Sequence, residues 1–173
     1  MDIFYEQMIK PKRTWMDFLK VVLGAIVALG LTVLCLGLYL FGLNLLAIFL
    51  IWWGYVKLVR SINVEYEYSI TNNEFDIDVI KGKATRKHIT TINLNNSKFF
   101  GLAKNPNTIA LMNSQTPDKT YYFVCDKASE NLYVTDVLSR KNNAKIRVFV
   151  EPNTEMLKYI RIANPKAFIG EDL

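Results

Sequence analysis

The hydrophobic pattern of the chain is dominated by one long uncharged run. From position 21 to position 56 the sequence contains no Asp, Glu, Lys or Arg. One membrane-spanning helix needs about 20 apolar residues, so the run has the length of two. Gly42 and Asn44 interrupt it, and both residue types favour turns. We therefore predict two helices, near 21–40 and 43–59, joined by a tight turn within the membrane's far interface. A secretory signal peptide has a much shorter apolar region.

Charged and aromatic residues flank this predicted hairpin in the manner of membrane–water interfaces. Thr14 can cap the first helix, with Asp17 three positions later. Lys and Arg occur before and after the hairpin and not in its turn, so the positive-inside rule places both ends in the cytoplasm. The expected interface anchors are Trp15, Lys20, Trp52, Trp53, Lys57 and Arg60. The predicted localisation is a multi-pass protein of the cell membrane with cytoplasmic termini.

After residue 60 the pattern changes to the two-residue period of β-strands. Residues 64–71 and 74–79 alternate apolar with polar side chains, and Asn72-Asn73 between them suits a hairpin turn. Pairing Thr71 with Glu74 places all the apolar residues of both strands on one face, which fixes the register. These residues are Val64, Tyr66, Tyr68, Ile70, Phe75, Ile77 and Val79.

The opposite face of the same two strands carries carboxylates: Glu65, Glu67, Glu74, Asp76 and Asp78. A calcium loop has a recognisable ligand spacing, and catalytic carboxylates need a cleft; neither signal is present. We therefore interpret these carboxylates as the solvated side of a sheet. The basic stretch that follows can place Arg86 beside Asp78 and His88 beside Asp76.

The remainder of the chain indicates an α+β domain. Short strands are predicted near 98–102, 108–112, 120–125, 131–138 and 145–150, separated by turns rich in Asn and Pro. Residues 151–165 then show helical periodicity, with Asn153 as cap and Pro165 as stop. The predicted fold is an antiparallel β-barrel or sandwich of about seven strands with a C-terminal helix. The domain boundaries are 1–20 for a basic and aromatic N-terminal segment, 21–60 for the hairpin and 61–173 for the cytoplasmic domain.

Two segments carry a resemblance to a known family. VEYEYSITNNEFDIDVIKGKATRK (64–87) and IRVFVEPNTEMLKYI (146–160), placed after an apolar hairpin, resemble uncharacterised bacterial membrane proteins with a pleckstrin-homology-like (PH-like) domain. The resemblance implies a PH-like fold displayed at a membrane and carries over no catalytic residue. Eukaryotic phosphoinositide-binding PH domains are basic at the first hairpin turn, where this chain has TNNE.

Composition restricts the chemistry further. The chain has 173 residues, a formal net charge of +5, one histidine and two cysteines. His88 cannot form a histidine-based metal site alone, and Cys35 and Cys125 form no CxxC pair. No P-loop, GxSxG, HExxH or GxGxxG motif is present. We expect no catalytic, cofactor or metal site, and no nucleic-acid binding, because residues 61–173 contain 15 basic and 13 acidic residues.

The basic turn after the second strand gives one candidate site. The first strand leaves the membrane near Arg60 and the second returns, so the following turn should lie near the bilayer. We expect Lys81, Lys83, Arg86 and Lys87 to contact anionic lipid, each contributing about 1 kcal/mol. A solvated turn that pairs with the acidic face is the alternative.

The sequence thus predicts a membrane-anchored, non-enzymatic PH-like protein that acts as a binding or scaffolding module at the inner face of the membrane. Its expected partners are membrane lipid and an unidentified protein, with a second copy of the chain left open. One alternative is a subunit of a larger transport or envelope complex, contacted through Gly24 and Ala28 on the hairpin. An unrecognised enzyme is the other, and a deep pocket with convergent polar groups would favour it.

Overall fold

The computed structural model describes residues 4–37, 43–138 and 144–169, and the chain divides into two compact units. The helix unit comprises Lys12–Val64 and Lys81–Thr85. The sheet unit comprises Met1–Pro11, Glu65–Ile80 and Arg86–Leu173. Each unit is described separately below.

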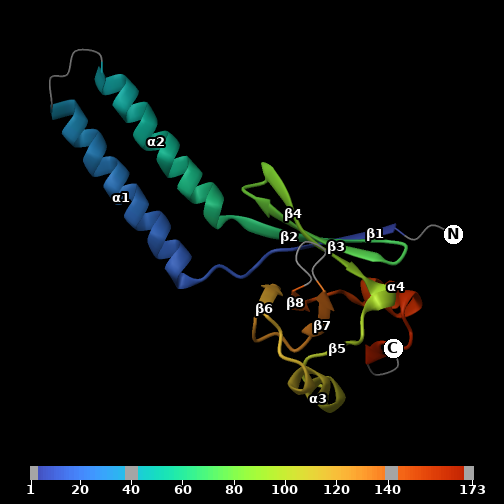
Figure 1. The fold of residues 1–173 in the computed structure, drawn as a ribbon. Helices are drawn as coiled ribbons and strands as arrows, with labels where there is room; N and C mark the ends of the chain where they lie inside the picture. The colour runs from blue at the N-terminus through green and yellow to red at the C-terminus, as the bar shows by residue number, and fades with distance from the viewer. Residues whose placement is uncertain (1–3, 38–42, 139–143, 170–173) are drawn as a thin grey trace. The chain divides into compact units, whose positions relative to one another are not determined.

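The helix unit contains α1 (Trp15–Gly37) and α2 (Leu43–Ile62), drawn in blue and teal in Figure 1. The predicted start at Thr14 is confirmed, because its carbonyl accepts the N–H groups of Asp17 at 2.9 Å and Phe18 at 3.3 Å. The Asp17 carboxylate accepts the Thr14 N–H in return at 3.2 Å, as in a capping box. The predicted turn at Gly42 lies outside the described residues.

The two helices form a hairpin with little buried surface. A Cβ added at Gly24 would lie 2.7 Å from Leu58 and 3.6 Å from Tyr55, so α2 packs directly on this glycine. Ala28, one turn further, is buried at 4% exposure. Both helices are long and apolar enough to cross a membrane, with segments of 23 and 19 residues.

The first sheet of the sheet unit has the strand order β1-β2-β3-β4. Its strands are β1 (Phe4–Ile9), β2 (Val64–Thr71), β3 (Glu74–Lys81) and β4 (Thr85–Asn93). Sequence analysis did not predict β1, which pairs antiparallel with β2 from Phe4↔Thr71 to Ile9↔Tyr66. The turn at Asn72 is confirmed, since this residue has a positive φ of 55°.

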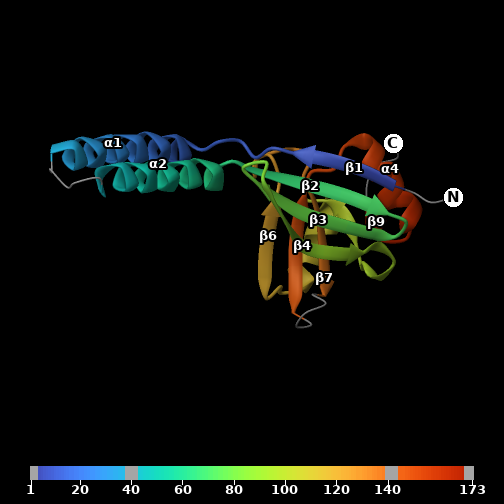
Figure 2. The ribbon, with the colours of Figure 1, turned by 90° about the horizontal axis from the view of Figure 1, so that it is seen from above.

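The second sheet has the order β6-β8-β7-β5-β9, and Figure 2 shows its main strands running across those of the first. Its strands are β5 (Phe100–Leu102), β6 (Lys119–Phe123), β7 (Tyr133–Leu138), β8 (Lys145–Val150) and β9 (Phe168–Ile169). The pairs β6–β8 and β5–β9 are parallel, so the sheet is mixed rather than wholly antiparallel. The strands form two separate sheets, and a closed barrel is not confirmed.

The strand predicted at 108–112 is wrong, because this segment belongs to helix α3 (Pro106–Ser114). Asn105 caps the helix by accepting the N–H of Asn107 at 2.9 Å, and Pro106 occupies the first turn. Proline is favoured there because its missing N–H has no helical partner. A short 3₁₀ helix, η1 (Leu94–Asn96), links β4 to the second sheet.

The core lies on the facing sides of the sheets and under α4 (Thr154–Ala163). Tyr66 and Phe123 join the sheets through rings whose centroids are 5.4 Å apart. The predicted cap is confirmed, since Asn153 accepts the Met156 N–H at 2.8 Å. The predicted apolar face is confirmed too, with fully buried side chains that include Tyr68, Ile70, Phe75, Ile77, Met156 and Ile160.

Candidate functional site

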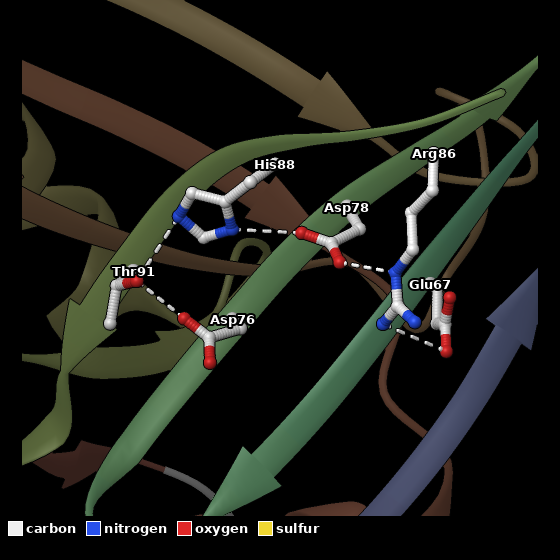
Figure 3. A network of polar contacts seen from close by, with 6 residues as sticks. All are labelled: Glu67, Asp76, Asp78, Arg86, His88 and Thr91. Carbon is white, nitrogen blue, oxygen red and sulfur yellow. Dashed lines mark hydrogen bonds and ion pairs between the residues drawn. The ribbon is translucent and has the colours of Figure 1, made fainter.

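The carboxylates of the first sheet form a network of polar contacts with β4, shown in Figure 3. Arg86 donates from Nε to Asp78 at 2.6 Å, and its Nη2 lies 3.1 Å from a Glu67 oxygen. His88 Nδ1 lies 2.8 Å from the other Asp78 oxygen. The hydrogen bond to Asp78 raises the pKa of Arg86 above its usual value. One guanidinium thus bridges carboxylates on two neighbouring strands.

Two expectations about this face need correction. Arg86 contacts Asp78 as predicted, but His88 contacts Asp78 as well, and Thr91 donates to Asp76 instead. The His88 ring also lies 3.2 Å from the Thr91 hydroxyl, although residues three apart point to opposite faces of a regular strand, so β4 departs from regular alternation between these two residues. Glu67 and Asp78 are also not solvated, with exposures of 8% and 9%. Arg86 forms an ion pair with each of them.

The tip between β3 and β4 belongs to the helix unit. The N–H of Gly82 donates to the Asn63 carbonyl at the end of α2 at 2.7 Å. Gly82 has a φ of +58°, and a Cβ there would lie 2.8 Å from the Cβ of Arg60. Lys83 follows with a φ of +56°, and Ala84 closes the turn by donating to the Lys81 carbonyl at 3.1 Å. The turn therefore packs tightly on the end of α2.

The four basic residues predicted to contact lipid fall into two groups. Lys81, Lys83 and Lys87 are exposed and form no ion pair with any residue that the structure describes. Arg86 instead uses its guanidinium within the network of Figure 3. The lysines thus remain the candidates for a contact with an anionic surface, whereas Arg86 holds the sheet together.

Of the predicted interface anchors, Trp15, Lys20, Lys57 and Arg60 lie in the half of the hairpin where α1 begins and α2 ends, whereas Trp52 and Trp53 lie near the middle of α2. Trp15, Trp52 and Trp53 have exposures of 73%, 42% and 51%. The Lys57 ammonium lies 3.7 Å from the centroid of the Trp53 ring, and Lys20 lies 3.5 Å from Asp17. Arg60 packs against Gly82 as described above.

A second polar cluster, which sequence analysis missed, joins β7, β8 and α3. Arg147 makes a bidentate pair with Asp136, with both contacts at 2.7 Å, and the two side chains are 11% and 8% exposed. Its Nη2 also donates to the carbonyls of Met112 at 2.8 Å and Gln115 at 3.0 Å. The bond to Asp136 raises the pKa of Arg147. The cluster anchors the end of α3 to the sheet.

A pocket of about 260 Å³ lies beside this cluster. It is formed by the ends of β4 and β7, η1, the start of β8 and the connection from α3 to β6. The lining residues are Thr91, Asn93, Asn96, Lys98, Gln115, Thr116, Asp136, Val137, Leu138 and Lys145. The sequence alone does not reveal the pocket, because its lining residues come from four separate stretches of the chain, 91–98, 115–116, 136–138 and 145. The sequence shows only that apolar and polar residues alternate in β7 and β8. The structure adds the pairing that places Asp136 opposite Arg147.

Comparison with known proteins identifies the family. The family model described as a bacterial PH-like domain (DUF6106) matches residues 1–170, which include both helices and both sheets. No curated protein and no solved structure matches the chain. Because the match covers almost the whole sequence, this chain belongs to the bacterial PH-like domain family DUF6106.

Proposed function

We propose that this chain is a membrane-anchored, non-enzymatic PH-like protein. In this proposal α1 and α2 cross the membrane twice, both termini lie in the cytoplasm, and the sheet unit acts as a binding or scaffolding module at the inner face. The observation that carries the proposal is the apolar exterior of the helix hairpin.

Large apolar side chains project from both helices although the helices pack on each other. Their exposures reach 61% at Ile26, 63% at Val33, 77% at Leu45 and 64% at Phe49. Such a surface is far more apolar than the surface of a water-soluble helix pair, and a lipid bilayer would cover it. Lipid contact therefore accounts for the composition of both helices.

The charges of the helix unit support the proposed orientation. Asp17 is its one acidic residue, and its basic residues are Lys12, Arg13, Lys20, Lys57, Arg60, Lys81 and Lys83. All seven basic residues lie near the end where α1 begins and α2 ends, or on the turn that packs there. A basic excess at one end of a membrane hairpin favours the cytoplasmic side for that end.

Within this proposal the exposed lysines of the tip contact anionic headgroups. Lys81 and Lys83 flank Gly82, which is fixed against the last turn of α2, so the tip is held near the membrane end of the helix. Each basic group close to an anionic leaflet contributes about 1 kcal/mol. Lys87 of the sheet unit is exposed as well, whereas Arg86 remains bound to Asp78 and Glu67.

The polar clusters favour binding over catalysis. Glu67 and Asp78 are paired with Arg86, and Asp136 is paired with Arg147, so these carboxylates are held as ion-pair partners. The pocket beside Asp136 has a largely apolar surface, including Val137 and Leu138, to which amides, hydroxyls and lysines are added. Its lining residues do not form the nucleophile–base pair that covalent catalysis requires. A ligand site fits this lining better than an active centre.

The alternative of a larger complex held through Gly24 and Ala28 has less support. Gly24 packs against Leu58 of the same chain, and Ala28 is already buried. Gly24→Leu would disrupt the packing of α1 on α2 within the chain, so loss of a complex in this variant would not show that Gly24 contacts a partner. Such a complex would have to use the exposed apolar faces instead.

A topology assay tests the proposal. A reporter that is active only in the cytoplasm, fused after Leu173 of the full chain, should be active, and the chain should remain in the membrane fraction after alkaline carbonate extraction. A reporter that works only outside the cytoplasm should be inactive at the same position. Release of the chain by carbonate, or activity of the external reporter, would refute the anchoring.

The lipid contact needs a separate measurement. A spin label is attached at Ala84→Cys in a chain whose Cys35 and Cys125 are replaced by serine, and nickel-chelating lipid is included in the nanodiscs. The relaxation rate of the label, which rises near the nickel at the lipid surface, should be higher in anionic than in neutral nanodiscs. Lys81→Glu with Lys83→Glu should abolish this difference. The matched charge change, Lys158→Glu with Lys166→Glu, should preserve it. An equal effect of both pairs would show that net charge, rather than the tip, is responsible.

A further inference from the structure

The pocket beside Asp136 has a composition suited to a particular class of ligand. We propose that it binds a small organic monocarboxylate with a short apolar body. The inference goes beyond the proposed membrane attachment and does not depend on it, because every lining residue belongs to the sheet unit. None of the lining residues belongs to the basic tip, which is part of the helix unit.

The charge of the lining is positive. Asp136 is its one acidic residue, and both carboxylate oxygens are engaged by Arg147 at 2.7 Å. That pair is neutral as a whole and is held further by the carbonyls that Arg147 binds. The remaining charged groups of the lining are Lys98 and Lys145, which form no ion pair in the described part of the chain. The Asp118 carboxylate, which is not part of the lining, accepts the backbone N–H of Lys145 at 2.8 Å. The pocket therefore presents to a ligand two lysine side chains without an ion-pair partner among the described residues.

The polar groups of the lining add hydrogen-bond donors. The side-chain oxygen of Asn93 accepts the Asn95 N–H, which leaves its amide nitrogen as a donor. The side chains of Asn96, Gln115 and Thr116 make no hydrogen bond to any residue within 4–37, 43–138 or 144–169. Amide and hydroxyl donors together with lysines are the groups that bind a carboxylate through charge-assisted hydrogen bonds.

One part of the lining is apolar and the volume is small. Val137 and Leu138 contribute aliphatic surface, and Leu138 is 62% exposed, which is high for a residue of its size. Water occupies about 30 Å³ per molecule in the liquid, so a pocket of about 260 Å³ has room for roughly nine such volumes. A ligand of about ten non-hydrogen atoms, such as benzoate, fits this space.

Fluorine NMR of para-trifluoromethylbenzoate tests the inference with the full chain in a neutral maltoside detergent. The fluorine signal should broaden on addition of protein, and unlabelled benzoate should reverse the broadening. The neutral methyl ester of the same compound should broaden much less, because it lacks the charge that the lysines bind. Equal broadening by acid and ester, or no competition by benzoate, would overturn the proposal.

Variants locate the binding. Lys98→Gln with Lys145→Gln should weaken binding by about tenfold, because both charged contacts to the ligand carboxylate are lost. Lys158→Gln with Lys166→Gln removes the same charge elsewhere on the sheet unit and should leave the affinity unchanged. Equal affinities for the two double variants would overturn the assignment to this pocket. The assay does not require membrane insertion, so its failure and that of the anchoring proposal are distinguishable.

Discussion

Removal of one partner of the Asp136–Arg147 pair should destabilise the sheet unit more than removal of both. The perturbations are Asp136→Leu, Arg147→Met and the double variant. Each single substitution leaves one buried charge without its counter-charge, whereas the double substitution leaves none. The comparison therefore separates the cost of an unpaired charge from the cost of losing the contact.

The geometry sets the expected magnitudes. The side chains are 11% and 8% exposed and share two hydrogen bonds of 2.7 Å, so water screens the pair weakly. Breaking a buried pair from one side costs about 3–5 kcal/mol. In the double variant the carbonyls of Met112 and Gln115 still lose their donor, and a buried acceptor left unpaired costs about 1–3 kcal/mol. We therefore expect the double variant to be more stable than either single variant.

Tryptophan fluorescence cannot report this effect, because Trp15, Trp52 and Trp53 all lie in the helix unit. Hydrogen exchange measured by mass spectrometry on β7 and β8 amides, in detergent with increasing urea, reports the sheet unit directly. The exposed pair of Lys104 and Glu130, at 60% and 89% exposure, provides the control. Lys104→Met should leave the exchange unchanged, since exposed pairs contribute little.

The reasoning fails if the two single effects add in the double variant. Additive losses would mean that each side chain stabilises the fold through separate contacts, and that neither charge depends on the other. A double variant less stable than both single variants would have the same meaning. A loss in the double variant that is smaller than the sum of the two single losses is the behaviour of a desolvated pair.

Three further predictions concern backbone fit and titration. Gly101→Ala would bring a Cβ into overlap with the Thr108 hydroxyl and should lower the free energy of unfolding, measured by urea denaturation, by about 1–3 kcal/mol. Gly82→Val combines a φ of +58° with a Cβ 2.8 Å from Arg60 Cβ, and it should make the β3–β4 tip sensitive to limited proteolysis. Burial raises the pKa of Tyr68, so its neutral form is favoured in the folded state. The free energy of unfolding should therefore fall as pH rises above about 10. Urea denaturation across that pH range should show a smaller fall in Tyr68→Phe than in the unchanged chain.

The elements that sequence analysis found are those whose apolar pattern is local. The uncharged run at 21–56 predicts the two helices because lipid-exposed helices need apolar residues on every face. The β2–β3 hairpin follows from alternation on both sides of Asn72, and α4 from the spacing of Met156, Leu157 and Ile160. Each of these signals is contained in a single short stretch of sequence.

The elements that it missed depend on distant partners or on ambiguous runs. β1 pairs with a strand that lies beyond the whole helix hairpin, and FYEQMI has no turn signal beside it. Ile109–Met112 is a short apolar run, which fits a strand or a helix. The helix forms because Asn105 caps it and Pro106 occupies its first turn. The pocket and the pair of Asp136 with Arg147 require the register of β7 and β8, which sequence alone does not give.

The position of β1 has a consequence for how the sheet unit can be isolated. The chain leaves β1 to enter the helix hairpin and re-enters the same sheet as β2, with Ile9 paired to Tyr66 and Lys10 3.3 Å from Glu65. A truncation before residue 61 removes β1, which opens the β2 edge and exposes unpaired N–H and C=O groups. The Gln7 side chain donates to the Glu151 carbonyl at 3.1 Å and accepts the Asn153 N–H at 2.8 Å, and both hydrogen bonds are lost with β1. Replacement of the helices by a short turn between β1 and β2 keeps the β1–β2 pairing and the Gln7 hydrogen bonds, because the two strand ends to be joined are already neighbours in the sheet.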